Sequence, residues 1–355
     1  MLFYNLIFFT VIFILFAINA GFIVAMEFGK KIELSAQKYI VVALSIVLFL
    51  ITAFRSNEVG ADTSMYSHLA TNSNVFDLYT TEFITYGLLN LLNLLGKPGL
   101  LIPIFSFLYI RNLTVFVLNK REKRNLLLLF FLFWTSFFIQ SLAINVIRQG
   151  VAVSFLLLAL SSYYNKNNLK AILYCIIAIG FHKSATIPII VFFLTAILPI
   201  WSSILLYFVC IIVSVKGFGI LDIASKFIGS NISGEAQVYL TFQDQSYQVG
   251  FRPQFVLFNT FFLIAFSILY FFRVNLGNDI KYYSRLLKMY IINSCIFFLM
   301  FQLPFSDRWG INAWVLIPVL LMPFLKEHDR YKVIFTCSIL IFQTLVFLFF
   351  TLTQK

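Results

Sequence analysis

The chain has 355 residues, of which 61% are hydrophobic and only 11% are charged, and its mean hydropathy is +0.93. Soluble domains are about half apolar and about a quarter charged, so this composition excludes a soluble globular protein. It predicts an all-α polytopic membrane protein. In a soluble protein the net charge of +12 would suggest nucleic acid as a partner. Here we attribute that charge to the orientation of the loops and expect no nucleic-acid partner.

Apolar runs follow one another along almost the whole chain. Because a membrane span needs roughly 20 apolar residues, we predict about 11 or 12 transmembrane helices within a single integral membrane domain, residues 1–355. The runs cover residues 1–26, 36–54, 99–118, 125–143, 146–163, 169–186, 187–200, 202–216, 253–273, 285–304, 309–325 and 331–352.

Two runs need a separate interpretation. The first, Met1 to Met26, lacks a basic start and is too long for a signal peptide, so we expect it to be a span. The run from Phe83 to Leu95 is too short to cross the membrane and ends at Gly96-Lys97-Pro98-Gly99. It is expected to form a re-entrant or interfacial helix.

The positive charges are unevenly distributed between the connections. Positive residues mark cytoplasmic loops, and alternation through the runs brings five basic connections to one side, which we predict to be cytoplasmic. The polar segments 55–82 and 217–252 and both termini then face outward. If 83–95 crossed the membrane, or 187–200 did not, every later loop would change sides. The five connections hold Lys30, Lys31, Lys38, Lys120, Arg121, Lys123, Arg124, Lys166, Lys170, Arg273, Lys281, Arg285, Lys288, Lys326, Arg330 and Lys332.

A second group of cations falls at the outer ends of the predicted spans, where the orientation rule does not explain them. This group holds Arg55, Arg148, Lys183, Arg252 and Arg308. Arg55 follows an outward-running helix, and a cation is favourable at such a C-terminal end.

Arg148, Arg252 and Arg308 instead stand where inward-running helices are expected to begin. A cation at a helix N-terminus is unfavourable by about 0.3–1 kcal/mol. An anion would remove that penalty, because helix N-termini bind phosphate and arginine can hold it in a two-pronged grip. The alternative is that each arginine extends to a lipid phosphate at the interface.

Candidates for proton transfer lie on the same predicted outer face. Asp62 either caps a short helix or serves as a general base, and Glu82 could act in the same way. His182 is a second candidate base, since an imidazole takes up a proton near neutral pH. The alternative for His182 is a hydrogen-bonded interfacial residue. Lys183 would lower the proton affinity of this histidine or contact a phosphate.

These residues together resemble a known family. The pattern resembles the EpsG-like family of bacterial polysaccharide polymerases, which are similar to the Wzy-type O-antigen and capsule polymerases, and the resemblance extends from Phe54 to about Pro318. The residues that carry it are Arg55-x4-Gly60-x-Asp62-Thr63-x2-Tyr66, Glu82, Asn145-x2-Arg148-Gln149, Phe181-His182-Lys183-Ser184-Ala185, and Arg308 before the run that ends at Pro318.

The resemblance implies a metal-independent membrane glycosyltransferase of GT-C-like architecture, without a cofactor, in the bacterial cytoplasmic (inner) membrane. Such enzymes transfer a growing chain from undecaprenyl pyrophosphate onto the next lipid-linked repeat unit, at a site that faces the periplasm or exterior. The implied partners are this lipid-linked oligosaccharide, membrane lipids and a chain-length regulator protein. His182 and Asp62 compete for the role of base, and Arg252 rests on topology alone. The implied substrate-binding residues are Arg148, Arg308, Arg252, Arg55, Glu82, Lys183, Tyr66, Gln149 and Asn145.

Three other functions fit the same composition. A flippase for the lipid-linked oligosaccharide would need charges at the middle of the membrane, whereas these lie at helix ends. A membrane O-acyltransferase would need a histidine near the cytoplasmic side, whereas His182 is predicted outside. A ligase that transfers the finished chain is chemically close to the polymerase.

The predicted topology can be tested by labelling. In a variant without the native cysteines, we expect an impermeant thiol reagent to label Ser73→Cys from outside and Asn125→Cys only from inside. Labelling of both from the same side would contradict the assignment of a common outer face.

Overall fold

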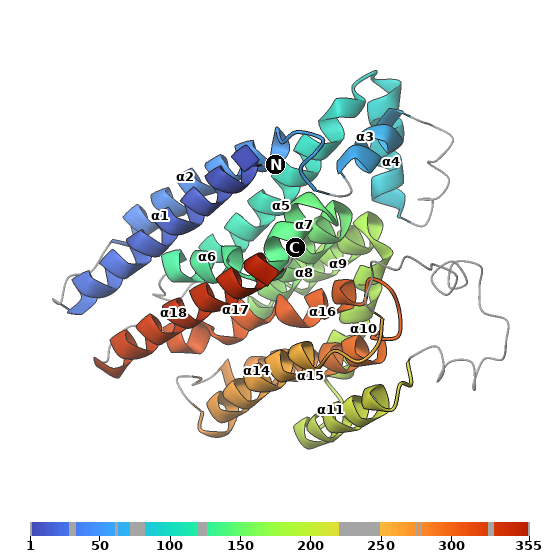
Figure 1. Ribbon diagram of the computed structural model, residues 1–355. Coiled ribbons are helices and arrows are strands. Elements are labelled where there is room, and N and C mark those ends of the chain that lie inside the picture. The colour runs from blue at the N-terminus through green and yellow to red at the C-terminus, as the bar shows by residue number, and fades with distance from the viewer. Residues whose placement is uncertain are drawn as a thin grey trace, which may run out of the picture. The chain divides into compact units, whose positions relative to one another are not determined.

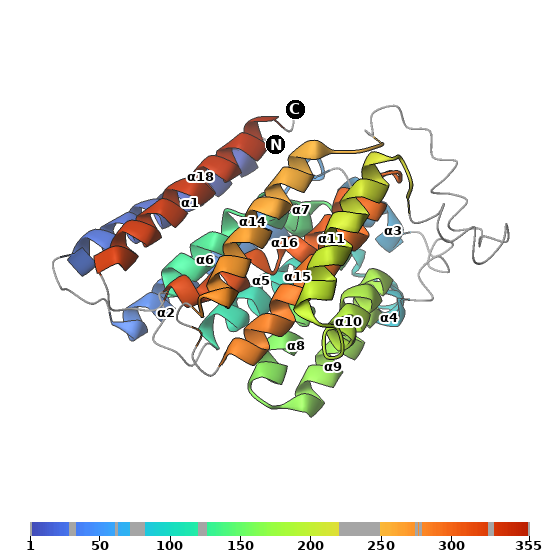
Figure 2. The same cartoon turned by 90° about the horizontal axis from the view of Figure 1, so that it is seen from below.

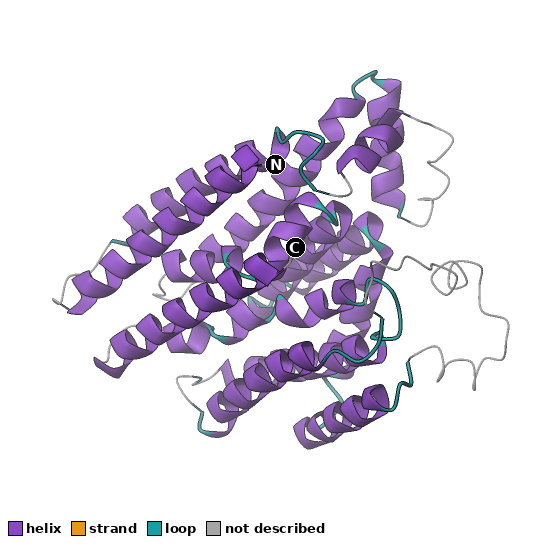
Figure 3. Cartoon of the chain, in the orientation of Figure 1, coloured by secondary structure: helices purple, strands orange, loops and turns teal. Residues whose placement is uncertain are grey.

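The computed structural model describes residues 2–27, 33–60, 63–71, 82–119, 126–219, 249–273, 276, 279–325 and 330–353. Those residues form helices, turns and connections, with no strand among them (Figures 1 and 3). An all-α membrane protein is therefore confirmed. The chain divides into two compact units, residues 1–186 with 324–355 and residues 187–323.

The predicted apolar runs of the first unit are helices. Long stretches of Leu, Ile, Phe and Val have the length and apolar surface that a membrane helix needs. They appear as α1 (Leu2–Glu27), α2 (Leu34–Ala53), α3 (Thr63–Thr71), α4 (Phe83–Leu94), η2 (Pro98–Leu100), α5 (Leu101–Leu118), α6 (Leu126–Trp134), α7 (Phe137–Ile144), α8 (Ile147–Tyr164), α9 (Asn168–Phe181), η3 (Lys183–Ala185) and α18 (Arg330–Thr353). The first and last helices, α1 and α18, lie side by side (Figure 2).

The run predicted as one span over 125–143 is broken in two. Helices α6 and α7 meet at an angle of 71°. At the break, the Thr135 hydroxyl donates to the Phe131 carbonyl and the Ser136 hydroxyl donates to the Leu132 carbonyl. Both donor–acceptor distances are 2.7 Å. Hydroxyls that bond back to the preceding turn bend helices. The periodicity of the sequence did not reveal this bend, because both halves are apolar and no Pro or Gly separates them.

Polar side chains join the helices of this unit where they are most deeply buried. Asn112 of α5 donates to Ser154 of α8 over 3.1 Å, and Thr114 of α5 donates to Ser45 of α2 over 2.7 Å. In hydrocarbon there is little hydrophobic drive between helices, so such bonds fix which helices pair. They hold α5 between α2 and α8, and α8 carries one of the predicted site residues.

Among the described residues, four helices are long and apolar enough to cross a membrane, or five if the bent α6–α7 pair counts as one span. The four are Tyr4–Ala25, Leu34–Ala53, Pro98–Leu118 and Pro253–Phe271. Sequence analysis predicts about 11 or 12 from apolar runs of roughly 20 residues. Most of the other predicted spans form helices that are shorter or interrupted, such as α9.

The second unit is also helical. It contains α10 (Thr186–Leu194, of which Thr186 belongs to the first unit), α11 (Ile200–Val215), α14 (Pro253–Phe271), α15 (Ile280–Leu299), α16 (Asp307–Trp314), α17 (Ile317–Leu320) and the start of η5 (Met322–Leu325). At its centre Tyr290 donates to the Asn259 carbonyl over 2.8 Å. The run predicted over 309–325 is thus divided among α16, α17 and η5.

Two cations of this unit that were counted among the predicted cytoplasmic charges also bond to backbone carbonyls. Lys288 donates to the carbonyls of Thr195 and Leu198, at 2.5 and 2.9 Å, just beyond the end of α10. Arg285 donates to the Phe192 carbonyl over 3.1 Å. Cations at a helix C-terminus satisfy its last carbonyls. A count of positive residues could not detect this role.

The close approach of α7 and α8 depends on Gly150, because a Cβ added there would overlap the Leu142 carbonyl oxygen. We therefore expect Gly150→Ala to force the two helices apart and to lower the free energy of unfolding by about 1–3 kcal/mol. Gly21→Ala is the matched control, since a Cβ on Gly21 has no atom within 4 Å. Thermal unfolding in detergent measures both, and equal midpoints would contradict the tight α7–α8 contact.

Candidate functional site

Four side chains that are far apart in the sequence meet at one end of the first unit. Tyr66 comes from α3, Glu82 immediately precedes α4, Arg148 stands in the first turn of α8, and His182 follows the last residue of α9. All four are site residues predicted from the sequence. The structure brings them together around the Glu82 carboxylate.

Glu82 is 3% exposed and is the centre of this group. Its Oε2 atom accepts a hydrogen bond from Nη1 of Arg148 in an ion pair. Its Oε1 atom lies 2.5 Å from Nδ1 of His182 and accepts from the backbone N–H of Lys183 over 3.3 Å. One buried carboxylate therefore connects the start of α8 with the end of α9.

The balance of forces on Glu82 favours the ionised form. Burial by itself raises the pKa of this carboxyl, but the hydrogen bond from His182, the charges of Arg148 and His182 and the Lys183 N–H together lower it below the ordinary 4.5. Hydrogen bonds and cations that stabilise a carboxylate outweigh desolvation in this way when several converge. Glu82 is therefore negatively charged at neutral pH.

Local structure sets the position of His182 relative to Glu82. Helix α9 ends at Phe181, and His182 takes an extended backbone conformation, with φ −155° and ψ 121°. The Thr85 hydroxyl donates to the Phe181 carbonyl over 2.9 Å, which joins the start of α4 to the end of α9. Gly180 allows this approach, because an added Cβ would lie 2.6 Å from Ile84.

Arg148 is held on two sides. Besides the ion pair, its Nε donates to the Tyr66 hydroxyl over 3.2 Å, and its guanidinium carbon lies 5.9 Å from the centre of the Tyr66 ring. Sequence analysis predicts an anion beside this cation, because a helix N-terminus already carries partial positive charge. The structure supplies one such anion from the protein itself, the carboxylate of Glu82.

The contacts of Arg55 are with protein acceptors. Its Nε, Nη1 and Nη2 atoms donate to Thr63 Oγ1 at 3.1 Å, to the Thr52 carbonyl at 2.5 Å and to the Ile144 carbonyl at 3.2 Å. Burial lowers the pKa of Arg55 to about 10, so it remains a cation at neutral pH. Arg55 thus fastens the end of α2 to the start of α3 and the end of α7.

Gly60 belongs to the same junction. Its φ of +88° is in the region that only glycine adopts without strain, and an added Cβ would lie 2.5 Å from the Ile144 carbonyl oxygen. The spacing Arg55-x4-Gly60 therefore brings two residues of one segment to the end of α7. Both residues approach the same carbonyl, next to Asn145.

Four other predicted site residues belong to the first unit. Asp62 lies outside the described residues. Asn145 caps the C-terminal end of α7, and Gln149 is buried in the first turn of α8. Lys183 is exposed at the start of η3.

The two other arginines belong to the second unit. Arg252 stands at the N-cap of α14. Arg308 lies in the first turn of α16, directly after Asp307. Their predicted positions at helix N-termini are confirmed. In the described part of the chain, no three His, Cys, Asp or Glu side chains are arranged to hold a metal ion.

A model of the EpsG family matches residues 38–355, nearly the whole chain. The chain belongs to the EpsG family. The resemblance to this family that the motifs between Phe54 and Pro318 indicate is therefore confirmed. No curated protein and no solved structure matches the chain.

Membership in the EpsG family assigns the chain to polysaccharide biosynthesis in a membrane, with a polymerase-like role. The geometry at Glu82 adds chemistry to that assignment. A carboxylate on Nδ1 holds an imidazole in the tautomer whose Nε2 can accept a proton. An adjacent arginine provides positive charge for an anionic substrate group.

The Glu82 interactions predict a dependence of stability on pH. Because the folded-state pKa of Glu82 is lowered, its ion pairs stabilise the protein above the ordinary pKa of 4.5, and this stability is lost as the pH falls through the folded-state pKa. His182 faces the same carboxylate through Nδ1, 2.5 Å from Oε1, and Arg148 faces it through Nη1.

We therefore expect Glu82→Gln to lower the unfolding temperature at pH 7 and to differ less from the wild type at pH 3. The measurement is thermal unfolding of the detergent-solubilised protein at both values. A constant difference would mean that the charge of Glu82 contributes nothing.

Proposed function

We propose that this EpsG-family protein joins lipid-linked oligosaccharide repeat units at the outer face of the bacterial cytoplasmic membrane. It transfers the growing chain from undecaprenyl pyrophosphate onto the next repeat unit. The observation that carries the proposal is the contact of one buried carboxylate, Glu82, with both His182 and Arg148. These two side chains match the two requirements of the reaction, a proton acceptor and a partner for pyrophosphate.

His182 is the proposed base. Nε2 takes the proton of an acceptor hydroxyl while the hydroxyl oxygen attacks the anomeric carbon of the donor sugar. The bond from that carbon to the pyrophosphate oxygen breaks, and the pyrophosphate departs with the electron pair. Glu82 orients the ring through Nδ1, 2.5 Å away, and stabilises the imidazolium that forms.

Arg148 is the proposed partner of the departing pyrophosphate. Its side chain remains 17% exposed beside the first turn of α8, where backbone N–H groups favour phosphate. Lys183 is exposed next to His182. The single charge of Glu82 balances only one of these two cations, so the group is net positive while His182 is neutral. Preorganised positive charge stabilises a leaving group as its negative charge develops.

Among the other predicted ligands, Tyr66 changes its role, and the rest keep the roles that the sequence suggests. Tyr66 supports Arg148 through its hydroxyl, so its proposed part in substrate binding is indirect. Asn145 and Gln149 flank Arg148 in the sequence and are proposed to contact the sugar. Arg252 and Arg308 are proposed as further phosphate ligands, Asp62 as the alternative base, and a chain-length regulator as a protein partner.

The nearest alternative is the ligase that transfers a finished chain, since it uses the same chemistry. The contact between His182 and Glu82 favours either transferase over a flippase, because transport of a lipid-linked sugar requires no proton acceptor beside an arginine. The deletion phenotype separates the polymerase from a flippase and from an O-acyltransferase. Loss of a polymerase leaves glycolipid with a single repeat, loss of a flippase leaves none, and loss of an O-acyltransferase leaves full-length chains.

The roles of His182 and Arg148 can be tested in a deletion strain complemented with variants. His182→Ala should reduce polymer by roughly 10²–10⁴-fold, which is the usual contribution of a general base. Arg148→Lys keeps the charge but loses the planar fork, so polymer should also fall sharply. The measurement is a gel of surface polysaccharide, with protein level checked by blot.

Matched controls use residues of the same kind outside the site. His68→Ala changes an exposed histidine of α3, and Arg111→Lys changes an exposed arginine of α5. Both should leave the wild-type ladder unchanged. Wild-type ladders from His182→Ala and Arg148→Lys, at normal protein level, would contradict the proposed base and the proposed pyrophosphate partner.

A further inference from the structure

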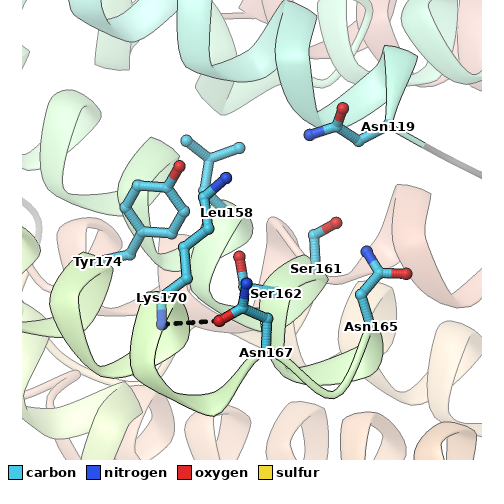
Figure 4. Close-up of a pocket in the computed structure, with 8 residues that line it drawn as sticks. All are labelled: Asn119, Leu158, Ser161, Ser162, Asn165, Asn167, Lys170 and Tyr174. Atoms are coloured by element: carbon cyan, nitrogen blue, oxygen red, sulfur yellow. Dashed lines mark hydrogen bonds between the residues drawn. The ribbon is translucent and has the colours of Figure 1, made fainter.

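A polar pocket lies at the opposite end of α8 and α9 from Glu82. Helix α8 ends at Tyr164 and α9 begins at Asn168, and the pocket is formed by this turn and by Asn119 at the end of α5 (Figure 4). Its volume is about 110 Å³. A single water molecule needs only roughly 10–15 Å³ of such space, so a larger polar group fits.

Two serines in the pocket lack the partners that most buried hydroxyls in this protein have. Ser161 and Ser162 are 4% and 8% exposed, and both line the pocket. Elsewhere a buried helical hydroxyl donates to the preceding turn, as Ser45 does to the Val41 carbonyl over 2.7 Å. Within the described residues, neither Ser161 nor Ser162 has a side-chain hydrogen bond. Because both serines border the pocket and neither hydroxyl is used within the described part of the protein, both hydroxyls are available to a ligand there.

The charge around the pocket selects the kind of ligand. Among the described lining residues there is one cation, Lys170, and no carboxylate, and the amides of Asn119, Asn165 and Asn167 can donate hydrogen bonds. Lys170 stands in the first turn of α9, where a cation is unfavourable unless an anion is near. The pocket therefore offers hydroxyl, amide and ammonium donors to an anionic group.

We propose that this pocket binds a phosphate group. Its donors can surround the oxygens of a phosphate, while Asn167 uses its side-chain oxygen to accept from the Lys170 backbone N–H over 3.2 Å. The phosphate belongs either to an anionic phospholipid or to a soluble phosphate compound. Leu169 and Leu173 are 80% and 52% exposed on the adjoining part of α9, which is the surface that acyl chains would cover.

The pocket is separate from the proposed catalytic group. On α8, Ser161 of the pocket follows Arg148 by 13 residues, which corresponds to about 20 Å at 1.5 Å per residue. By the charge distribution of the sequence, the turn that carries Lys166 and Lys170 is predicted to be cytoplasmic. The phosphate bound here is therefore distinct from the pyrophosphate proposed beside Arg148, and the proposal does not depend on that function.

The test uses the full-length protein extracted from vesicles of phosphatidylcholine with or without phosphatidylglycerol. Native mass spectrometry counts the anionic lipid that each variant retains. Lys170→Gln and the double variant Ser161→Ala/Ser162→Ala should weaken retention by roughly tenfold, since each removes hydrogen bonds to a charged group. Lys166→Gln is the control, because Lys166 is an exposed cation of the same turn outside the lining.

A second arm identifies the source of the phosphate. Inorganic phosphate is added to the same proteins in phosphatidylcholine alone, and thermal unfolding is measured. Stabilisation of the wild type and Lys166→Gln, but not of the pocket variants, would support a soluble phosphate ligand. Selective retention of phosphatidylglycerol would support the lipid. If the pocket variants match the wild type in both arms, the proposed site is wrong.

Discussion

The ion pair between the Glu82 carboxylate and Arg148 is the interaction on which the arrangement of the site depends. A buried carboxylate is costly unless cations and hydrogen bonds compensate it. Here the partners come from the first turn of α8 and from the residues that follow α9. Removal of Arg148 would leave the buried carboxylate without its cation, and removal of Glu82 would leave Arg148 without its anion. The site is thus a network in which position and charge are determined together.

Close approach of backbones makes this network possible. Gly150 allows α7 to contact α8, and Gly60 allows the segment before α3 to reach the Ile144 carbonyl. Arg55 then donates to the same carbonyl. These contacts fix the start of α8, and with it Arg148, relative to α3 and its Tyr66. In a membrane, where hydrophobic attraction between helices is weak, glycine contacts and buried hydrogen bonds supply this specificity.

The cations of the chain illustrate how one residue type serves several purposes. Positive residues at the ends of spans orient a membrane protein, yet Lys288 also binds the last carbonyls near α10. Arg55 was predicted as a substrate ligand, and three of its nitrogen atoms donate to protein acceptors. Glu82 was predicted to bind substrate directly, and its contacts are with Arg148 and His182. Partners of this kind cannot be derived from a count of charges.

The amino-acid sequence by itself determined the class of the protein and the approximate bounds of several helices, and it indicated residues that meet at the candidate site. Apolar runs are local features, so a helix such as α14 begins and ends within a few residues of the predicted 253–273. Only the tertiary structure decided which side chains meet. Glu82 contacts Arg148 across 66 residues of sequence and His182 across 100, and no local pattern encodes a pairing over that distance. The break between α6 and α7 could not be predicted for a related reason. Two short apolar helices and one long apolar helix have the same composition. The hydroxyl bonds of Thr135 and Ser136 that accompany the bend are seen only in the structure.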